Sequence, residues 1–398
     1  MVTLSTVEKA LKELYLGAII KQLNTESDPF IARIKRTSER ITGNNDIIRA
    51  AQIGINGGFG AGTETGQLPL PGENIYKKLR STTKNMYGVI AISDKSLKSL
   101  KGNDKGAFGN LIQNEITGMM ETAKWNFARQ VSGKSDGVLT TCKASGGATN
   151  KVPVNDVRLL IEGITIDILE AGGNPLATAR RILNIDRSKN EITISGAAVT
   201  TTAGMLITAQ GSYMLELTGL GDLFDTDSLT LYGNERASND WLNPYVKKNA
   251  GAINDAMLTE AIMRQEDAYN VNINYLRAGN DAYYAYAKYL EGRVRLINTT
   301  KLEGGFTALK VGEHPFVRNK FMRPDSIDFL DTEKFYLDQV SEWDWIPGPV
   351  GGIFVQNAGT ATYNATLAKY ADLMCVTPGG MARYEGITAP AEAAAVNE

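Results

Sequence analysis

A glycine-rich segment between two strand-like runs is the feature that most constrains how this chain can fold. Seven glycines lie at positions 54, 57, 58, 60, 62, 66 and 72. One apolar run (Ile47, Ile48, Ile53 and Ile55) enters the segment, and a second run at residues 87–92 leaves it. We therefore expect a long two-stranded excursion. A glycine-rich tip buries little surface within its own chain and costs backbone entropy to order, so we expect a neighbouring copy to order it.

The strongest helical pattern covers residues 106–131. One face of that helix would carry Phe108, Ile112, Ile116, Met119, Met120, Ala123, Phe127 and Val131. At 1.5 Å per residue the helix would be roughly 39 Å long, which is typical of a scaffold element. We expect it to end at Gly133.

The rest of the chain mixes helices and strands. A shorter amphipathic helix is expected over residues 6–23, before a polar, extended stretch. Residues 140–235 are rich in threonine and glycine, and we expect a small antiparallel β subdomain from runs at 163–168, 181–185, 191–194, 205–208 and 213–217. Helices are expected at 244–265 and 281–292, among strands at 271–276, 306–311, 316–317, 327–330, 334–337, 351–355 and 373–376.

Composition removes several classes of site. The 398 residues contain one histidine, His314, and two cysteines, Cys142 and Cys375. Structural zinc usually needs several Cys and His ligands, and a catalytic triad would depend on His314 alone. His314 follows Gly312 in a turn-like sequence between two strand runs. We therefore expect no catalytic or metal site.

The remaining motifs also favour structural roles. Residues 131–135 contain the Gly-Lys-Ser of a phosphate loop, but Ala128 replaces its first glycine and a helix precedes it. Asp222, Asp225 and Asp227 lack the spacing of a calcium loop and favour a solvated turn. We expect no cofactor. The tyrosines and tryptophans favour core and interface packing over base or sugar stacking; they are Tyr283, Tyr284, Tyr286, Tyr289, Trp241, Trp343 and Trp345.

The charge is divided unevenly along the chain. The net charge is −2, yet residues 1–105 carry 16 basic and 10 acidic side chains, while residues 106–398 carry 26 and 34. The basic part can complement the acidic part within a chain or between copies, although local drift in composition remains an alternative. This balance does not indicate a general nucleic-acid binder.

No run of about 18 apolar residues is present, so we expect no membrane span.

Five groups of local motifs follow one another in the sequence. Residues 87–94 form an apolar strand that ends in Ile-Ser before a helical segment, and residues 126–139 join a helix end to a glycine-containing stretch. The other groups lie at 216–220 with 231–236 and 241–244, at 304–306 with 309–317 and 327–330, and at 367–376. In this order, over about residues 6–386, they resemble the major capsid proteins of tailed phages with the Hong Kong 97-type fold.

The resemblance implies an α+β fold with an N-arm, an extended β-hairpin loop, a long spine helix, and peripheral and axial domains, interrupted by a β-rich insertion. The implied divisions are the N-terminal helix and arm at 1–46, the extended loop at 47–92, the spine helix and start of the peripheral domain at 93–139, the insertion at 140–235, and the axial and remaining peripheral domain at 236–398.

The resemblance also implies a function without enzymatic activity. Hexamers and pentamers of the chain would close into an icosahedral shell around double-stranded DNA, which is packaged without sequence-specific binding. The expected partners are a portal, a separate scaffolding protein and a decoration protein. The scaffolding protein is expected to be separate because no charged helical segment precedes the arm. The expected location is the virion, after assembly in the cytoplasm of a bacterial host.

Candidate interface residues come from the basic N-terminal third of the chain. They are Arg33, Lys35, Arg36, Lys77, Lys78, Arg80 and Lys84. Three alternatives remain open: a nanocompartment (encapsulin-like) shell protein, an enzyme of unidentified class, and a phage tail or receptor-binding protein. Nanocompartment chains are generally shorter and lack a large β insertion, and tail proteins tend to be β-rich throughout.

Overall fold

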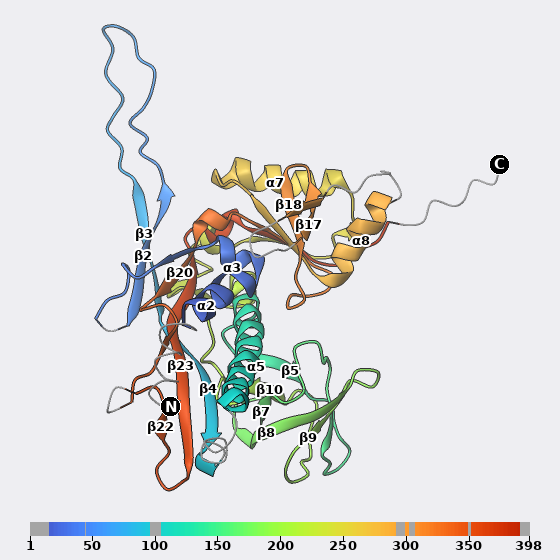
Figure 1. Cartoon of the computed structure of the whole chain (residues 1–398). Coiled ribbons are helices and arrows are strands. Elements are labelled where there is room, and N and C mark those ends of the chain that lie inside the picture. Colours follow the sequence, from blue (N-terminus) through green and yellow to red (C-terminus); the bar gives the residue numbers. More distant parts are fainter. Residues whose placement is uncertain are drawn as a thin grey trace, which may run out of the picture. The chain divides into compact units, whose positions relative to one another are not determined.

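The computed structural model describes residues 16–43, 45–95, 105–291, 299–301, 307–348 and 352–390 (Figure 1). The chain divides into two compact units. The main unit comprises Met1–Phe127, Leu223–Asn319 and Arg323–Glu398, and the inserted unit comprises Ala128–Asp222 with Lys320–Met322. The sequence alone assigned the insertion to residues 140–235.

A six-stranded sheet forms one half of the main unit. Its longest strand, β23 (Thr362–Cys375), pairs antiparallel with β4 (Lys84–Ser93) over ten residues and with β20 (Phe335–Gln339) over five. The shorter strands are β1 (Lys35–Thr37), β21 (Asp344–Trp345) and β22 (Val355–Gln356). Strand β23 therefore joins β4 from the N-terminal quarter of the chain to three strands from its C-terminal part.

The long hairpin consists of β2 (Asp46–Gly54) and β3 (Ile75–Thr82), which pair antiparallel from Asp46↔Thr82 to Gly54↔Ile75. The expected excursion is present, but its expected returning strand is wrong. Residues 87–92 lie in β4 and pair with β23 instead. Their apolar pattern arises because β4 faces the core and helix α5, whereas β3 buries only Leu79 and is polar.

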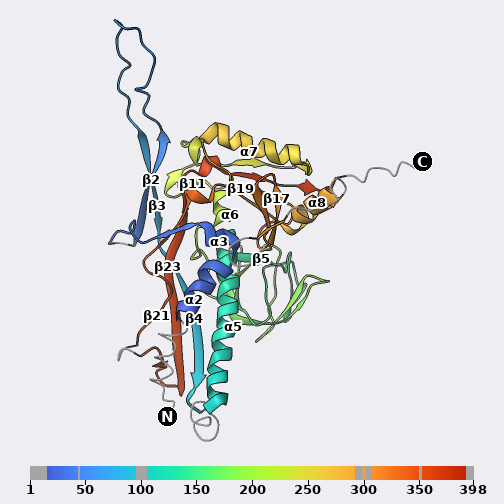
Figure 2. The same ribbon diagram turned by 45° about the horizontal axis from the view of Figure 1, so that its top comes forward.

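Helix α5 (Lys105–Ser132) confirms the strongest expectation from the sequence. Ile116, Met120, Phe127 and Val131 of its expected apolar face are buried. The Gly133 N–H donates to the Arg129 carbonyl at 2.8 Å, and the helix ends there as expected. In the main unit α5 runs beside β4 (Figure 2).

The N-terminal segment folds into short helical turns. Helix α2 (Leu16–Lys21) continues into η2 (Gln22–Glu26). These two elements contain the described part of the helix expected at residues 6–23. Residues 6–15 lie outside the described residues. Helix α3 (Pro29–Arg33) begins at Asp28, whose carboxylate accepts the Phe30 N–H at 2.7 Å. The buried Phe30 ring packs edge-on against Phe335 with centroids 5.1 Å apart.

A seven-stranded sheet and two helices form the other half of the main unit. The strands run in the order β13-β24-β19-β15-β18-β17-β16. Their bounds are Tyr245–Lys247, Ala382–Tyr384, Ile327–Leu330, Tyr275–Ala278, His314–Arg318, Thr307–Val311 and Thr299–Lys301. Helices α7 (Asp255–Tyr269) and α8 (Asn280–Glu291) contribute Leu258 and Tyr286 to the core of this half.

The helix expected at residues 244–265 begins at Asp255, eleven residues later than predicted. Residues 245–247 instead form β13, parallel to β24, and Gly251–Ala252 form β14 beside β25 (Ile387–Thr388). The helix is delayed because Asn249 and Gly251 have φ angles of 56° and 85°. Asn254 then caps α7 by accepting the Met257 N–H at 2.8 Å.

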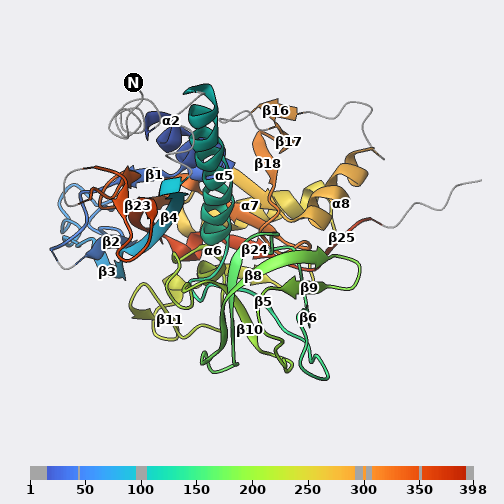
Figure 3. The same ribbon diagram turned by 60° about the horizontal axis from the view of Figure 1, so that its bottom comes forward.

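The inserted unit contains a six-stranded sheet in the order β5-β10-β7-β8-β9-β6 (Figure 3). Its strands are Val138–Thr141, Leu206–Ala209, Thr165–Leu169, Pro175–Asp186, Glu191–Ile194 and Lys151–Pro153. Four of the five expected runs are confirmed, but 213–217 is a turn. Met214 adopts a φ of 59°, and the buried Glu216 carboxylate accepts a hydrogen bond from Arg129.

The Gly-Lys-Ser sequence closes a loop within the inserted unit. The Ser135 N–H and Oγ donate to the two oxygens of Asp222 at 2.8 and 3.1 Å, and the Gly219 N–H donates at 3.1 Å. Burial nevertheless raises the pKa of the Asp222 carboxyl from 3.8 to about 6. The motif therefore binds a carboxylate of its own chain.

This raised pKa predicts a pH dependence. The ionised Asp222 is less favourable in the folded chain than in the unfolded chain, so its contribution to stability is present below about pH 3.8 and lost as the pH rises through about 6. Relative to Asp222→Asn, the wild-type free energy of unfolding should fall by roughly 2 kcal/mol between pH 4 and 7. Guanidinium unfolding followed by circular dichroism measures this difference.

Asp186 is the matched control, since it lies on the surface of the same unit and hydrogen bonds from Ser188 lower its pKa. The difference between wild type and Asp186→Asn should change in the opposite direction with pH. A pH-independent difference for Asp222→Asn would contradict the assignment.

Candidate assembly surfaces

The two faces of the hairpin differ near its root. Along β2, Ile47, Arg49 and Ala51 are buried and alternate with exposed residues, and Leu79 of β3 is buried opposite them. This alternation is expected of a strand that rests on a core on one side only. Beyond Ala51 the burial stops, so the hairpin has an anchored root and an uncovered outer part.

Arg49 and Asp338 connect the hairpin root to the six-stranded sheet. The Arg49 Nε and Nη2 donate to the two carboxylate oxygens of Asp338 on β20, both at 2.7 Å. The guanidinium also lies 3.8 Å from the ring centroid of Tyr336. Both charged side chains are buried. A planar guanidinium paired in this way fixes orientation as well as distance.

Strand β3 is fixed by contacts of its own. The Ser81 Oγ donates to the buried carboxylate of Asp372, which lies opposite Asp338 in the sheet. The Arg80 N–H donates to the Tyr232 carbonyl, and the Asn234 side-chain amide donates to the Lys78 carbonyl, both at 2.9 Å. Both strands of the hairpin are thus held at the root.

The tip of the hairpin, residues 55–74, extends beyond the paired strands β2 and β3 (Figure 1). It leaves large apolar side chains in solvent. Phe59 is 99% exposed, Leu68 is 83% exposed and Leu70 is 78% exposed. The tip still has local order, because the Asn56 side chain accepts the Gly58 N–H at 2.8 Å and the Gly72 N–H at 3.2 Å. Three large apolar side chains exposed in one loop make the tip a candidate interaction site.

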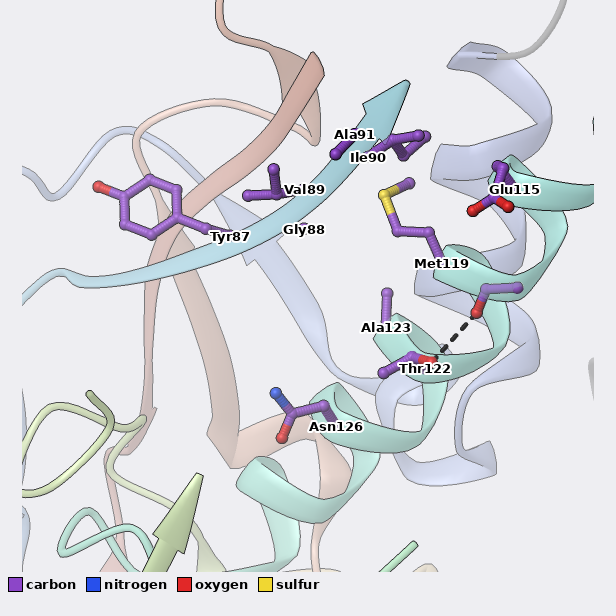
Figure 4. A pocket seen from close by; sticks show the side chains of 11 residues that line it. Tyr87, Gly88, Val89, Ile90, Ala91, Glu115, Met119, Thr122, Ala123 and Asn126 are labelled. Atoms are coloured by element: carbon purple, nitrogen blue, oxygen red, sulfur yellow. Dashed lines mark hydrogen bonds between the residues drawn. The ribbon is translucent and has the colours of Figure 1, made fainter. Parts of the chain in front are cut away.

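A groove of about 340 Å³ lies between β4 and α5 (Figure 4). Tyr87 and Val89, each 56% exposed, stand on its strand side. Met119 reaches from the helix toward Gly88, where an added Cβ would meet the sulfur at 3.1 Å. The helix side also presents Glu115 and Thr122, whose hydroxyl bonds the Gly118 carbonyl at 3.1 Å. The groove has an apolar wall and a polar one.

The structure separates the basic candidates into two groups. Arg33 and Arg36 bond main-chain carbonyls of their own chain, Arg33 to Asn274 at 3.4 Å and Arg36 to Asn24 at 3.2 Å. Arg80 pairs with Asp46 across the hairpin.

Four lysines make up the second group. Lys77 and Lys78 are exposed on β3, Lys35 is exposed on β1 with its amine 5.8 Å from the Tyr336 ring, and Lys84 is half-buried at the start of β4. The exposed lysines therefore surround the root of the hairpin.

Three exposed apolar residues of the tip were not among the candidates from the sequence. Phe59, Leu68 and Leu70 lie between glycines and prolines, where no strand or helix period indicates burial. The signal that could have found them is large apolar side chains in a segment too rich in glycine to bury them.

The described residues lack two kinds of feature. They contain no group of three or more His, Cys, Asp or Glu side chains that could hold a metal ion. Of the helices described, none is long and apolar enough to cross a membrane.

Comparison with known proteins identifies the fold. No protein-family model matches the sequence, and no curated protein is significantly similar to it. Among solved structures, the capsid of cyanophage A-1(L) is similar with a TM-score of 0.51 and 11% identity, over 93% of this chain and 92% of that chain. The chain therefore has the Hong Kong 97-type fold of tailed-phage capsid proteins, α+β with a β-rich insertion.

Two other solved structures are similar over most of their length. The procapsid of satellite phage P4 aligns with a TM-score of 0.45 and 12% identity, over 95% of this chain and 92% of that chain. An encapsulin complex from Synechococcus elongatus PCC 7942 aligns with a TM-score of 0.48 and 9% identity, over 95% and 94%.

The hairpin anchor predicts a large difference between single and double variants. Arg49→Met leaves the Asp338 carboxylate buried without its guanidinium and should lower the free energy of unfolding by about 3–5 kcal/mol. Arg49→Met combined with Asp338→Leu removes both charges and should recover most of that loss. Urea unfolding of the full chain measures both values.

Arg80→Met is the control for this pair, because the Arg80–Asp46 ion pair is exposed on the arginine side. Its cost should stay below about 1 kcal/mol. Equal losses for Arg49→Met and Arg80→Met would contradict the anchoring role.

Proposed function

We propose that this chain is a major capsid protein, which assembles as hexamers and pentamers into an icosahedral phage head around double-stranded DNA. The observation that carries the proposal is the long hairpin. Its root is clamped by buried polar contacts, and its tip exposes apolar side chains that its own chain leaves uncovered. The Hong Kong 97-type fold of the chain supports the same conclusion.

The hairpin tip lacks apolar burial among the described residues of its own chain. Burying an apolar side chain contributes about 1.5–3 kcal/mol, and Phe59, Leu68 and Leu70 make no such contribution within one chain. A neighbouring copy that covers them supplies it, once for every interface around a ring. Many modest contacts per subunit then add to a stable shell. On this proposal 1–46 is the N-arm, 47–92 contains the extended loop and the strand β4 that returns to the sheet, and 93–139 is the spine. The insertion at 140–235 and the axial and remaining peripheral domain at 236–398 follow.

Charge complements the apolar contact. Lys35, Lys77 and Lys78 present free positive charge beside the hairpin root, in a part of the chain that is net basic. Acidic side chains of a neighbour's remaining sequence are their natural counterparts. The other candidates, Arg33, Arg36, Arg80 and Lys84, would contribute at the edge of the same surface.

The proposed partners follow from a shell that is filled after it closes. A separate scaffolding protein directs assembly, a portal occupies one vertex, and a decoration protein binds the outer surface. The DNA is enclosed without sequence-specific binding, and no enzymatic activity is required of the chain. Assembly takes place in the cytoplasm of the bacterial host, and the finished protein resides in the virion.

Negative-stain electron microscopy of the purified full chain, with and without a candidate scaffolding protein, tests the proposal. We expect closed shells, or rings of five and six. A monomer or dimer under both conditions would overturn it. Shells that package an enzyme in place of DNA would assign the chain to the nanocompartment alternative.

The hairpin tip predicts a separation of folding from assembly. Phe59→Ser, Leu68→Ser and Leu70→Ser together should abolish shells and rings, since each side chain loses its contact with a neighbour. The melting temperature should change little, because these residues bury nothing in their own chain. Electron microscopy and thermal unfolding measure the two effects.

The matched control for the tip is Thr63→Ala with Thr65→Ala, which changes exposed polar residues of the same loop. Shells should form as in the wild type. Normal assembly of the triple serine variant would contradict the assigned role of the tip.

The exposed lysines predict sensitivity to salt. Raising the ionic strength from 0.1 to 1 M shortens the screening length from about 10 to about 3 Å and should reduce the yield of rings and shells. Lys77→Glu with Lys78→Glu should reduce assembly at low salt, whereas Lys143→Glu with Lys151→Glu in the inserted unit should not. Salt-insensitive assembly would indicate that apolar packing dominates.

A further inference from the structure

The hairpin tip contains an asparagine followed directly by a glycine, and this pair occurs once in the sequence. Asn56 and Gly57 form the only Asn-Gly dipeptide among the 398 residues. Because glycine has no side chain, its main-chain nitrogen can approach the Cγ of the preceding asparagine closely. Both residues are exposed to solvent. The pair therefore combines an electrophile, a nucleophile and access to water.

Two main-chain N–H groups converge on the side-chain oxygen of Asn56. The Gly58 N–H donates to Asn56 Oδ1 at 2.8 Å, and the Gly72 N–H, from the other arm of the loop, donates to the same oxygen at 3.2 Å. A side chain that reaches the N–H two residues later is folded back over the peptide between them. That peptide carries the Gly57 nitrogen, so the two bonds turn Cγ toward the atom that can attack it.

Glycines form this cradle, because a side chain would fill it. A Cβ added to Gly72 would lie 2.6 Å from the Gly57 nitrogen and 2.8 Å from Asn56 Oδ1, and one added to Gly58 would lie 2.9 Å from the same oxygen. The Asn56 N–H is itself held by Asn74, whose Oδ1 accepts it at 2.9 Å. Two fixed N–H groups on one carbonyl oxygen are the donor arrangement of an oxyanion hole.

We propose that Asn56 is a self-modification site, which closes a succinimide ring onto Gly57 and opens to aspartate or isoaspartate. Hydroxide from the solvent takes the proton of the Gly57 N–H, and the nitrogen attacks Asn56 Cγ. Negative charge develops on Oδ1 between the Gly58 and Gly72 N–H groups. The Cγ–Nδ2 bond then breaks, and Nδ2 takes a proton from water and leaves as ammonia. Water opens the ring at either carbonyl carbon and leaves one new carboxylate.

The reaction changes the charge of the hairpin tip. Residues 55–74 contain two acidic residues, Glu64 and Glu73, and no lysine or arginine, so one further carboxylate takes their net charge from −2 to −3. Hydrogen bonds to a carboxylate are roughly twice as strong as those to a neutral amide. An aspartate product therefore tightens the contact between the two arms of the loop, whereas isoaspartate adds one carbon to the main chain.

The inference does not depend on assembly, because every reacting group belongs to one copy. Unassembled chain is sufficient to observe the reaction. Its failure and the failure of the proposed function are therefore distinguishable.

Tryptic peptide mapping of the full chain by mass spectrometry, followed over several days, tests the inference. The peptide of residues 50–77 should gain the mass difference between an amide and a carboxyl group, through a succinimide that is lighter by one ammonia. The rate should rise about tenfold for each pH unit, since hydroxide removes the proton. An isoaspartate-specific methyltransferase should label the product. Asn56→Gln should show no change, because its side chain is one carbon too long for the ring.

A synthetic peptide of residues 52–62 is the reference, since it keeps the Asn-Gly pair and lacks Gly72. Asn56 should react about tenfold faster in the folded chain than in this peptide, less than the roughly 10²–10³-fold effect of an enclosed donor because the tip is open to water. Gly72→Ala should lower the rate in the chain to that of the peptide. The matched control is Asn357→Gln, which alters an asparagine that begins another turn and precedes alanine, and its Asn56 should react as in the wild type.

Two results would overturn the inference. The first is a rate in the folded chain equal to or below that of the peptide, which would mean that the two hydrogen bonds protect the side chain. The second is an unchanged rate in Gly72→Ala, since the opposite arm of the loop would then contribute nothing. Gly57→Ala guards against a folding defect, because its Cβ meets no atom within 4 Å and yet hinders the attacking nitrogen, so its rate should fall. Circular dichroism checks the fold of both variants.

Discussion

The pairing of Arg49 with Asp338 is the contact on which the main unit's most extended feature depends. A two-stranded hairpin is marginally stable alone in water, and the outer part of this one has no third strand. An exposed ion pair would contribute little. Because this pair is buried, bidentate and covered by Tyr336, the arginine has one favourable orientation. The direction of the hairpin is therefore set at its root, while the tip remains free for a partner.

The centre of the six-stranded sheet carries buried polar groups, and each receives a different peripheral segment. Asp338 on β20 receives Arg49 of β2, and Asp372 on β23 receives Ser81 of β3. Glu342, which pairs with Lys369 of β23, receives Asn24 of the N-terminal turns. Apolar side chains at these positions would pack in several registers, whereas a buried charge is satisfied in one arrangement only. The sheet thus specifies where the arms attach, and apolar packing supplies most of the stability.

Sequence patterns predicted the elements whose periodicity is unbroken and missed those whose character depends on distant residues. The buried face of α5 and four strands of the inserted unit could be predicted because apolar residues recur at a regular spacing along each element. Strand β3 was missed because only Leu79 is buried in it. Residues 213–217 alternate like a strand, yet Glu216 is buried because it pairs with Arg129 of helix α5. The late start of α7 is set by two left-handed residues before Asn254.

The candidate site was predictable in kind but not in its contacts. Glycine content indicated an excursion that needs a neighbour, and charge indicated Lys77 and Lys78, which are exposed. The contact between Arg49 and Asp338 could not be predicted from the sequence, because the two residues lie 289 positions apart. An enzyme site gathers such distant residues around a cavity for a small molecule. Here they gather in the sheet to hold an arm, and the tip beyond them keeps Phe59, Leu68 and Leu70 exposed among the described residues. On the proposed function a second copy covers this surface, and the chemistry of the surface is association.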